Sequence, residues 1–335
     1  MSEYQYYEFQ AVDRPLTPTE MAELRKLTTR ATITPYRLQN VYHWGDFKGD
    51  PDELIERYFD AFVYVANWGT NWLMFRLPSG AIDFEQASCY VVEPSLKLRR
   101  HDELTIVEFR SEDEEGGWWI EDEEAEGWMP SLLPLRADLM QGDLRPLYVA
   151  WLAAIQPGLF GNGLAEVEED EFEEYVEDSW IDPDTSEPPV PAGLGQPSAA
   201  LIALGKFLRL DPDLLAVAAE KSNPQLLQRP SSEELGEWLR RVPELDKDDW
   251  LLRLLTGTGQ QVTSEILRRY RHEQPGPASE PTASMPGRTA GELLSKARAR
   301  AEARKRHEAE QRARARAAHL DSLVGREDAI WRQAE

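Results

Sequence analysis

Short hydrophobic segments with the length and residue types of strands recur in the N-terminal part of the chain. They are residues 4–12, 62–66, 72–77, 96–100 and 105–110. In the last segment, Val107 and Phe109 point to one face and Glu108 points to the other. Between the second and third segments, Asn67-Trp68-Gly69-Thr70 predicts a tight turn with a glycine available for positive φ. We therefore expect a largely antiparallel sheet.

Helical patterns follow clear start signals in the same region. Thr17-Pro18-Thr19-Glu20 is a capping box with proline at the first helical position, and Asp50-Pro51-Asp52-Glu53 predicts a second helix start. Residues 142–155 carry the most regular helical spacing of apolar side chains in the chain. Helices packed on an antiparallel sheet define an α+β fold, and we assign residues 1–165 to an α+β domain.

The rest of the chain divides into two linkers, a bundle and a tail. Residues 166–187 contain 12 acidic residues and no basic one, so residues 166–196 are predicted to be a solvated acidic and proline-rich linker. Helical spacing and cap signals at Asp211 and Ser231 predict a small helical bundle over residues 197–272. Residues 273–288 are rich in proline and glycine and predict a flexible linker.

Residues 289–335 form an alanine- and arginine-rich tail that predicts one long helix. Thr289-Ala290-Gly291-Glu292 is its capping box, and four acidic residues precede a basic residue by four positions. No large apolar residue lies between Leu294 and Leu320, so the helix has no stripe that a core would bury. We therefore expect this helix to remain available for contacts outside the body.

Charge is divided unevenly along the chain. The net charge is −24, but residues 288–335 carry a net +4, which leaves −28 for the preceding residues. An acidic body joined to a basic arm favours a protein that mediates contacts over a catalyst. Cys89 is the only cysteine, so no disulfide framework forms within one chain. The N-terminus lacks a signal-peptide pattern and no apolar run has the length of a membrane span, so we expect a cytoplasmic location.

The candidate contact residues of the arm are its basic side chains. They are Lys296, Arg298, Arg300, Arg304, Lys305, Arg306, Arg312, Arg314 and Arg316. Three glutamates lie among them and no aromatic residue does, which weakens the case for nucleic acid. We expect residues 289–335 to bind an acidic protein surface or the chain's own acidic body, and we expect no membrane partner.

A second candidate site lies in the aromatic-rich N-terminal domain. His43, Asp46, Trp68 and Trp72 combine a histidine and a carboxylate with aromatic side chains, as ligand pockets do. No nucleophile motif accompanies His43, and the acidic clusters lack the spacing of a calcium-binding loop. We predict no catalytic residue, no metal and no cofactor.

Three segments resemble a widespread family of uncharacterised bacterial proteins. They are Tyr64-Val-Ala-Asn-Trp-Gly-Thr70, Phe207-Leu-Arg-Leu-Asp-Pro-Asp-Leu-Leu215 and Arg326-Glu-Asp-Ala-Ile-Trp-Arg332. The resemblance runs through most of the chain and implies no activity, ligand or catalytic residue. It also implies a further helical segment after the last of the three, beyond Glu335.

Three functions remain as hypotheses. The first is a non-enzymatic cytoplasmic interaction or adaptor protein with an acidic body and a basic helical arm. The second is an enzyme or small-ligand-binding protein with a pocket in the N-terminal domain. The third is an acidic mimic of nucleic acid, based on the acidic clusters at residues 112–115, 121–126 and 166–187.

Overall fold

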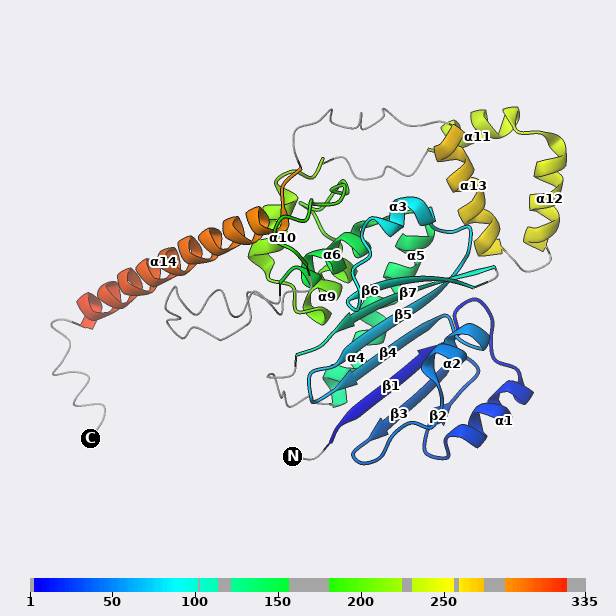
Figure 1. Cartoon of the computed structure of the whole chain (residues 1–335), viewed down its shortest axis with the longest axis horizontal. Helices are drawn as coiled ribbons and strands as arrows, with labels where there is room; N and C mark the ends of the chain where they lie inside the picture. Colours follow the sequence, from blue (N-terminus) through cyan, green and yellow to red (C-terminus); the bar gives the residue numbers. More distant parts are fainter. Residues whose placement is uncertain are drawn as a thin grey trace.

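A seven-stranded antiparallel sheet is the central element of the described structure. The computed structural model describes residues 3–101, 103–113, 122–156, 181–224, 231–255, 259–273 and 287–323. Within these residues the strand order is β2-β3-β1-β4-β5-β7-β6 (Figure 1). The strands are β1 (Gln5–Gln10), β2 (Thr32–Ile33), β3 (Arg37–Tyr42), β4 (Ala61–Ala66), β5 (Asn71–Pro78), β6 (Leu96–His101) and β7 (Leu104–Ser111). The fold is α+β, as the sequence predicts.

The predicted hairpin between residues 62–66 and 72–77 is present as β4 and β5. Gly69 lies in its turn with φ of +96°, and a Cβ atom there would lie 2.0 Å from the carbonyl oxygen of Asp113. Only glycine fits this turn, because a side chain would collide with the backbone that follows β7. The predicted alternation in β7 is also confirmed, since Val107 and Phe109 are buried on one face of the sheet and Ile106 on the other.

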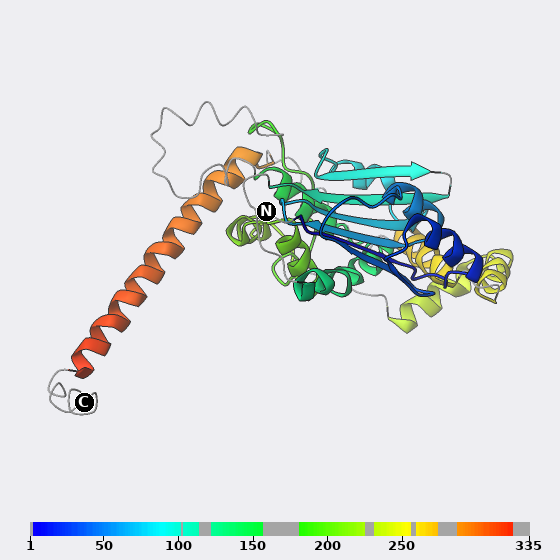
Figure 2. The same cartoon turned by 90° about the horizontal axis from the view of Figure 1, so that it is seen from below.

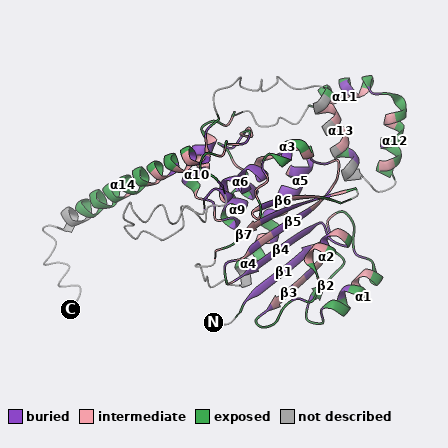
Figure 3. Ribbon diagram, in the orientation of Figure 1, coloured by how far each residue is buried: buried purple, intermediate pink, exposed green. Residues whose placement is uncertain are grey.

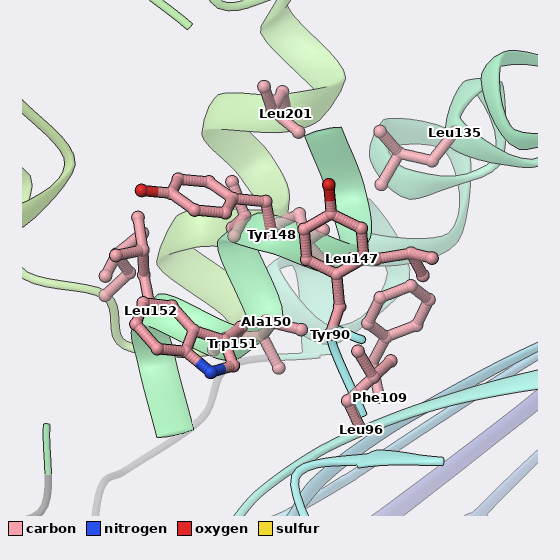
Figure 4. Packing of buried hydrophobic residues seen from close by; sticks show 14 of the residues in the cluster. Tyr90, Leu96, Phe109, Leu135, Leu147, Tyr148, Ala150, Trp151, Leu152 and Leu201 are labelled. Atoms are coloured by element: carbon pink, nitrogen blue, oxygen red, sulfur yellow. The ribbon is translucent and has the colours of Figure 1, made fainter. Parts of the chain in front are cut away.

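One face of the sheet is covered by a thick helical layer. It contains α4 (Asp122–Leu132), α5 (Pro134–Met140), α6 (Arg145–Ala154) and α9 (Ala199–Phe207), with α10 (Pro212–Ala219) behind them. Figure 4 shows how Tyr148 and Trp151 of α6 lie above the strand residues Leu96 and Phe109. The predicted helix over 142–155 is therefore confirmed as α6, although its first turn begins only at Arg145.

The opposite face carries two short helices. These are α1 (Pro18–Leu27) and α2 (Pro51–Arg57), and the predicted caps at Thr17 and Asp50 begin them. Their apolar side chains pack against a cluster of aromatic residues on β1, β3, β4 and β5. A further short helix, α3 (Phe84–Ser88), follows β5. Because α2 has only seven residues, part of this face extends beyond it.

The predicted bundle over residues 197–272 is divided in the structure. Helices α9 and α10 share one buried core with the sheet, and the Asn71 side-chain amide donates to the Phe207 carbonyl at 2.7 Å. The apolar faces of α9 and α10 pack into the core that covers the sheet. The sequence alone does not reveal that this apolar surface is available to them. The remaining helices, α11 (Ser232–Arg241), α12 (Glu244–Leu255) and α13 (Gly259–Glu273), form a separate small cluster around Trp238 and Trp250.

Some predictions fall on residues that the structure does not describe. These include a return strand that Trp118-Trp119-Ile120 predicts, residues 166–180 of the acidic linker, and residues 324–335 of the tail. Within the described part of the chain, no helix combines the length and the apolar character needed to cross a lipid bilayer.

Candidate functional site

The C-terminal helix α14 (Ala290–Leu323) leaves the body as a long rod (Figures 1 and 2). Its first two turns are buried against α10 and α6 through Ala290, Leu293 and Ala297. Further along, the helix is almost entirely exposed (Figure 3). We call residues 288–304 the base of the arm and residues 305–318 its outer part. The expectation that no core holds this helix is therefore wrong for the base and correct for the outer part.

Backbone pairing fixes the direction in which the arm leaves the body. Residues 185–187 lie antiparallel to the residues that precede α14, with a bridge between Ser186 and Thr289. The Ala290 amide donates to the Thr185 carbonyl at 2.9 Å. The predicted capping box is present, because Thr289 and Glu292 exchange backbone-to-side-chain hydrogen bonds. The first turn of α14 is thus anchored to the body by hydrogen bonds as well as by apolar packing.

A buried ion pair holds the base. The Arg288 guanidinium donates to the two carboxylate oxygens of Glu187 at 2.8 and 2.6 Å, and both side chains are less than 5% exposed, at 4% and 3%. The predicted solvated linker is therefore wrong for Glu187, the last residue of the acidic run. Glu187 is compensated there, because it also accepts the Tyr148 hydroxyl hydrogen bond. Paired on both sides, the carboxylate can remain charged without water.

Arg288 also caps the C-terminal end of α10. Its guanidinium donates to the Val217 and Ala218 carbonyls at 2.8 and 3.2 Å, where a helix presents unpaired acceptors and negative partial charge. Burial opposes the charge of Arg288, but its hydrogen bonds to Glu187 and the charge of that carboxylate outweigh it and raise the Arg288 pKa. Burial, and then the charge of Glu187, raise the pKa of Tyr148. Nothing in the sequence distinguishes Arg288 from the other arginines of the tail.

A carboxylate of α10 neutralises two arginines further along the base. Asp213 accepts from Arg304 Nε and Nη2 at 3.0 and 2.8 Å, and Arg300 Nε lies 3.5 Å from the same carboxylate. Hydrogen bonding to Asp213 raises the pKa of Arg304. Part of the arm's positive charge is therefore paired with the chain's own acidic body, and this part lies closest to the core.

Among the described residues, the ion pairs of the outer part are formed along α14 itself. Arg306, Arg312 and Arg314 pair with glutamates four positions earlier at 3.4, 3.7 and 3.8 Å, as three of the predicted pairs require. Their side chains are 75%, 81% and 83% exposed. Exposed pairs of this kind contribute little to stability, so these guanidinium groups can exchange partners at small cost.

The second candidate site is brought together only in part. Trp68 and Trp72 line a cavity of about 300 Å³ on the sheet face that α2 leaves uncovered. His43 does not line it, because its ring packs against Tyr4 and Trp44 with centroids 5.8 and 6.5 Å apart. Asp46 is connected to the cavity indirectly, by accepting from the Gln5 side-chain amide at 3.2 Å.

Two tyrosines in the cavity were not predicted as site residues. The Tyr7 and Tyr64 hydroxyls both donate to the Gln5 side-chain oxygen, at 2.8 and 3.3 Å. Burial raises the pKa of Tyr7 to about 12 and raises the pKa of Tyr64 as well. Both phenols therefore keep their protons at neutral pH and offer aromatic faces and hydrogen bonds instead of a base. The strand alternation could have found them, but only with the pairing register known.

Comparisons with protein-family models, with curated proteins and with solved structures give no match. Among the residues that the structure describes, no group of three or more histidine, cysteine or acidic side chains is placed to hold a metal ion. The two sites must therefore be interpreted from their own geometry and charge.

Proposed function

We propose that the protein is a non-enzymatic interaction protein, and that the outer part of α14 binds an acidic surface on a partner protein. The observation that carries this proposal is the contrast within one helix. At the base, Arg288 is buried against Glu187 and Arg304 is paired with Asp213, while Arg312 and Arg314 of the outer part are exposed and paired only along the helix. A cytoplasmic location belongs to the same proposal.

The length of the arm places its outer basic residues away from the negative charge of the body. The described body is acidic and would repel an acidic partner at close range, since the whole chain carries −24. A helix rises about 1.5 Å per residue, so the outer part extends roughly 20 Å beyond the base. Charges are screened over about 8 Å at physiological ionic strength. The outer arginines therefore act beyond most of the field of their own body.

A protein surface fits the outer part better than nucleic acid does. Glu308 and Glu310 lie among its basic residues and lower the density of positive charge. Proteins that bind single strands add aromatic side chains for base stacking, and residues 305–318 contain none. Guanidinium groups spaced between glutamates can instead pair with individual carboxylates on a partner.

The test measures binding of the full chain to an immobilised peptide of alternating glutamate and alanine, at roughly 50 and 200 mM salt. The arm variant replaces Arg306, Arg312, Arg314 and Arg316 with glutamine. The control variant makes the same change in net charge on the body, replacing the exposed Lys26, Arg57, Arg240 and Arg241 with glutamine. We expect roughly tenfold or greater loss of affinity in the arm variant and little change in the control.

Two results would contradict this proposal. Equal losses in the two variants would show that net charge, and not the arm, determines binding. Tighter binding to duplex DNA than to the acidic peptide would assign the arm to nucleic acid. Size measurement by light scattering, performed alongside, detects whether the acidic surface bound is that of a second copy of the chain.

A further inference from the structure

A row of four side chains crosses the sheet face that α1 and α2 only partly cover. Tyr7 of β1 lies opposite Tyr64 of β4, Tyr64 lies opposite Trp72 of β5, and Trp72 lies opposite Arg110 of β7. Directly opposed residues on neighbouring strands point to the same face. The register therefore places three aromatic rings and one guanidinium group side by side, although they are separated by more than a hundred positions at the extremes.

Two loops turn this row into a cavity. Phe47 and Gly49, between β3 and α2, line one part of it together with Pro51, the first residue of α2. Trp68 and Thr70 of the β4–β5 turn line another part. The space, which is open to solvent, is about 300 Å³, at the lower end of the range for small-molecule sites, roughly 300–1,000 Å³. The lining is mostly aromatic, so a flat apolar ring is the shape that it would cover best.

The polar groups around the cavity include one cation and one unpaired N–H group. Arg110 is the charged residue of the lining, and its guanidinium carbon lies 5.4 Å from the centre of the Trp72 ring. The Trp72 indole Nε1 is buried and has no hydrogen-bond partner among the described residues. A buried N–H group usually has an acceptor, in the protein or in a bound molecule.

The carboxylate that lies beside Arg110 offsets this preference only weakly. Glu112 lies 2.8 Å from Arg110 Nε but is 47% exposed, so their ion pair is weak and easily rearranged. The two tyrosine protons are directed to Gln5. The lining thus offers a cation beside aromatic faces, which favours an anionic oxygen attached to a ring and disfavours a cationic ligand.

We propose that this cavity binds a small planar aromatic carboxylate, with its ring among Tyr7, Tyr64 and Trp68 and its carboxylate at Arg110. This site is independent of the arm and of the partner that the arm binds. It makes the protein a receptor for a small molecule as well as an interaction protein.

The test uses isothermal titration of the full chain with 2-naphthoate and with 2-naphthamide, which has the same ring but no charge. The carboxylate should bind saturably and roughly tenfold or more tightly than the amide, because it gains a charge-assisted hydrogen bond. Arg110→Met should remove this preference. Arg57→Met is the matched control, since Arg57 also lies over an aromatic ring, that of Tyr58, but outside the cavity.

A second variant tests the position of the ring. Trp68 is 43% exposed in a turn, so Trp68→Ala should fold and should weaken binding of both compounds. Unchanged affinity in that variant would overturn the placement of the ring. The proposal as a whole is overturned if wild-type protein shows no saturable binding of 2-naphthoate, if the two compounds bind equally, or if a naphthyl trimethylammonium cation binds more tightly.

Discussion

The base and the outer part of the arm are joined by one continuous helix, α14, but have opposite surroundings. Both are rich in alanine and arginine. In the base, Arg288 is buried against Glu187, and Arg304 is paired with the largely buried Asp213. In the outer part, arginines such as Arg312 remain more than four-fifths exposed, at 81%. The same residue type is thus used for anchoring at one end and is available for recognition at the other.

This difference shows that local composition determines the helix but not its role. Alanine content and acid-before-base pairs stabilise helical structure along the whole segment. Whether an arginine anchors or recognises depends on carboxylates contributed by segments far away in sequence. Substitutions that separate these two roles should therefore have very different effects on unfolding and on binding.

The largest effect is expected at the buried pair of the base. Arg288→Met should lower the free energy of unfolding by about 3–5 kcal/mol, because it leaves Glu187 buried and uncompensated and removes the donors to the end of α10. Urea unfolding followed by circular dichroism would measure the loss. Arg316→Met, at an exposed position of the outer part, is the matched control and should change stability by less than about 0.5 kcal/mol.

A double variant distinguishes the loss of the ion pair between Arg288 and Glu187 from a general loss of stability. Adding Glu187→Gln to Arg288→Met removes the uncompensated charge, so the double variant should lose clearly less than the sum of the two single changes. Additive losses would show that the two residues do not act as a pair, and that the base is held by apolar packing alone.

Much of the fold could be predicted from the sequence because its signals are local. The capping boxes at Thr17 and Ser231, the glycine turn at Gly69 and the alternation in β7 each depend on a few neighbouring residues. Strand β3 was not predicted from the sequence. Every second residue between Arg37 and Tyr42 is buried, but that burial depends on pairing with β1 and β2, which the local pattern does not show. The packing of α9 on the sheet could not be predicted either, since nothing local in the sequence indicates it.

The sites depend even more on distant partners. The arginines of the arm could be identified from composition, but the division between base and outer part depends on Asp213 and Glu187, which the sequence does not connect to them. In the cavity, Trp68 and Trp72 could be predicted as site residues because they are aromatic residues near a turn. Tyr7 and Arg110 join them only through the pairing of β1, β4, β5 and β7.

A smaller effect is expected where the base meets the outer part. Asp213→Asn should lower the free energy of unfolding by about 1 kcal/mol, because it removes the charge that Arg300 and Arg304 share, and those arginines are about half exposed, at 51% and 48%. Arg300 and Arg304 then keep only exposed partners, Glu220 and Glu308. The effect on stability should shrink at high salt, whereas a loss that is independent of salt would indicate damage to the start of α10 instead.

The smallest effect on stability is expected within the outer part itself. Glu308 lies 3.3 Å from Arg304 and 3.7 Å from Arg312, so Glu308→Gln should cost no more than about 0.5 kcal/mol per pair that it removes. The same change releases the Arg312 guanidinium, while Arg304 remains paired with Asp213, and it adds one unit of positive charge to the arm. It should therefore slightly lower helix content by circular dichroism while it tightens binding to the acidic peptide. Glu302→Gln frees Arg306 in the same way, and if neither variant binds more tightly, the exposed arginines of the arm do not contact the partner.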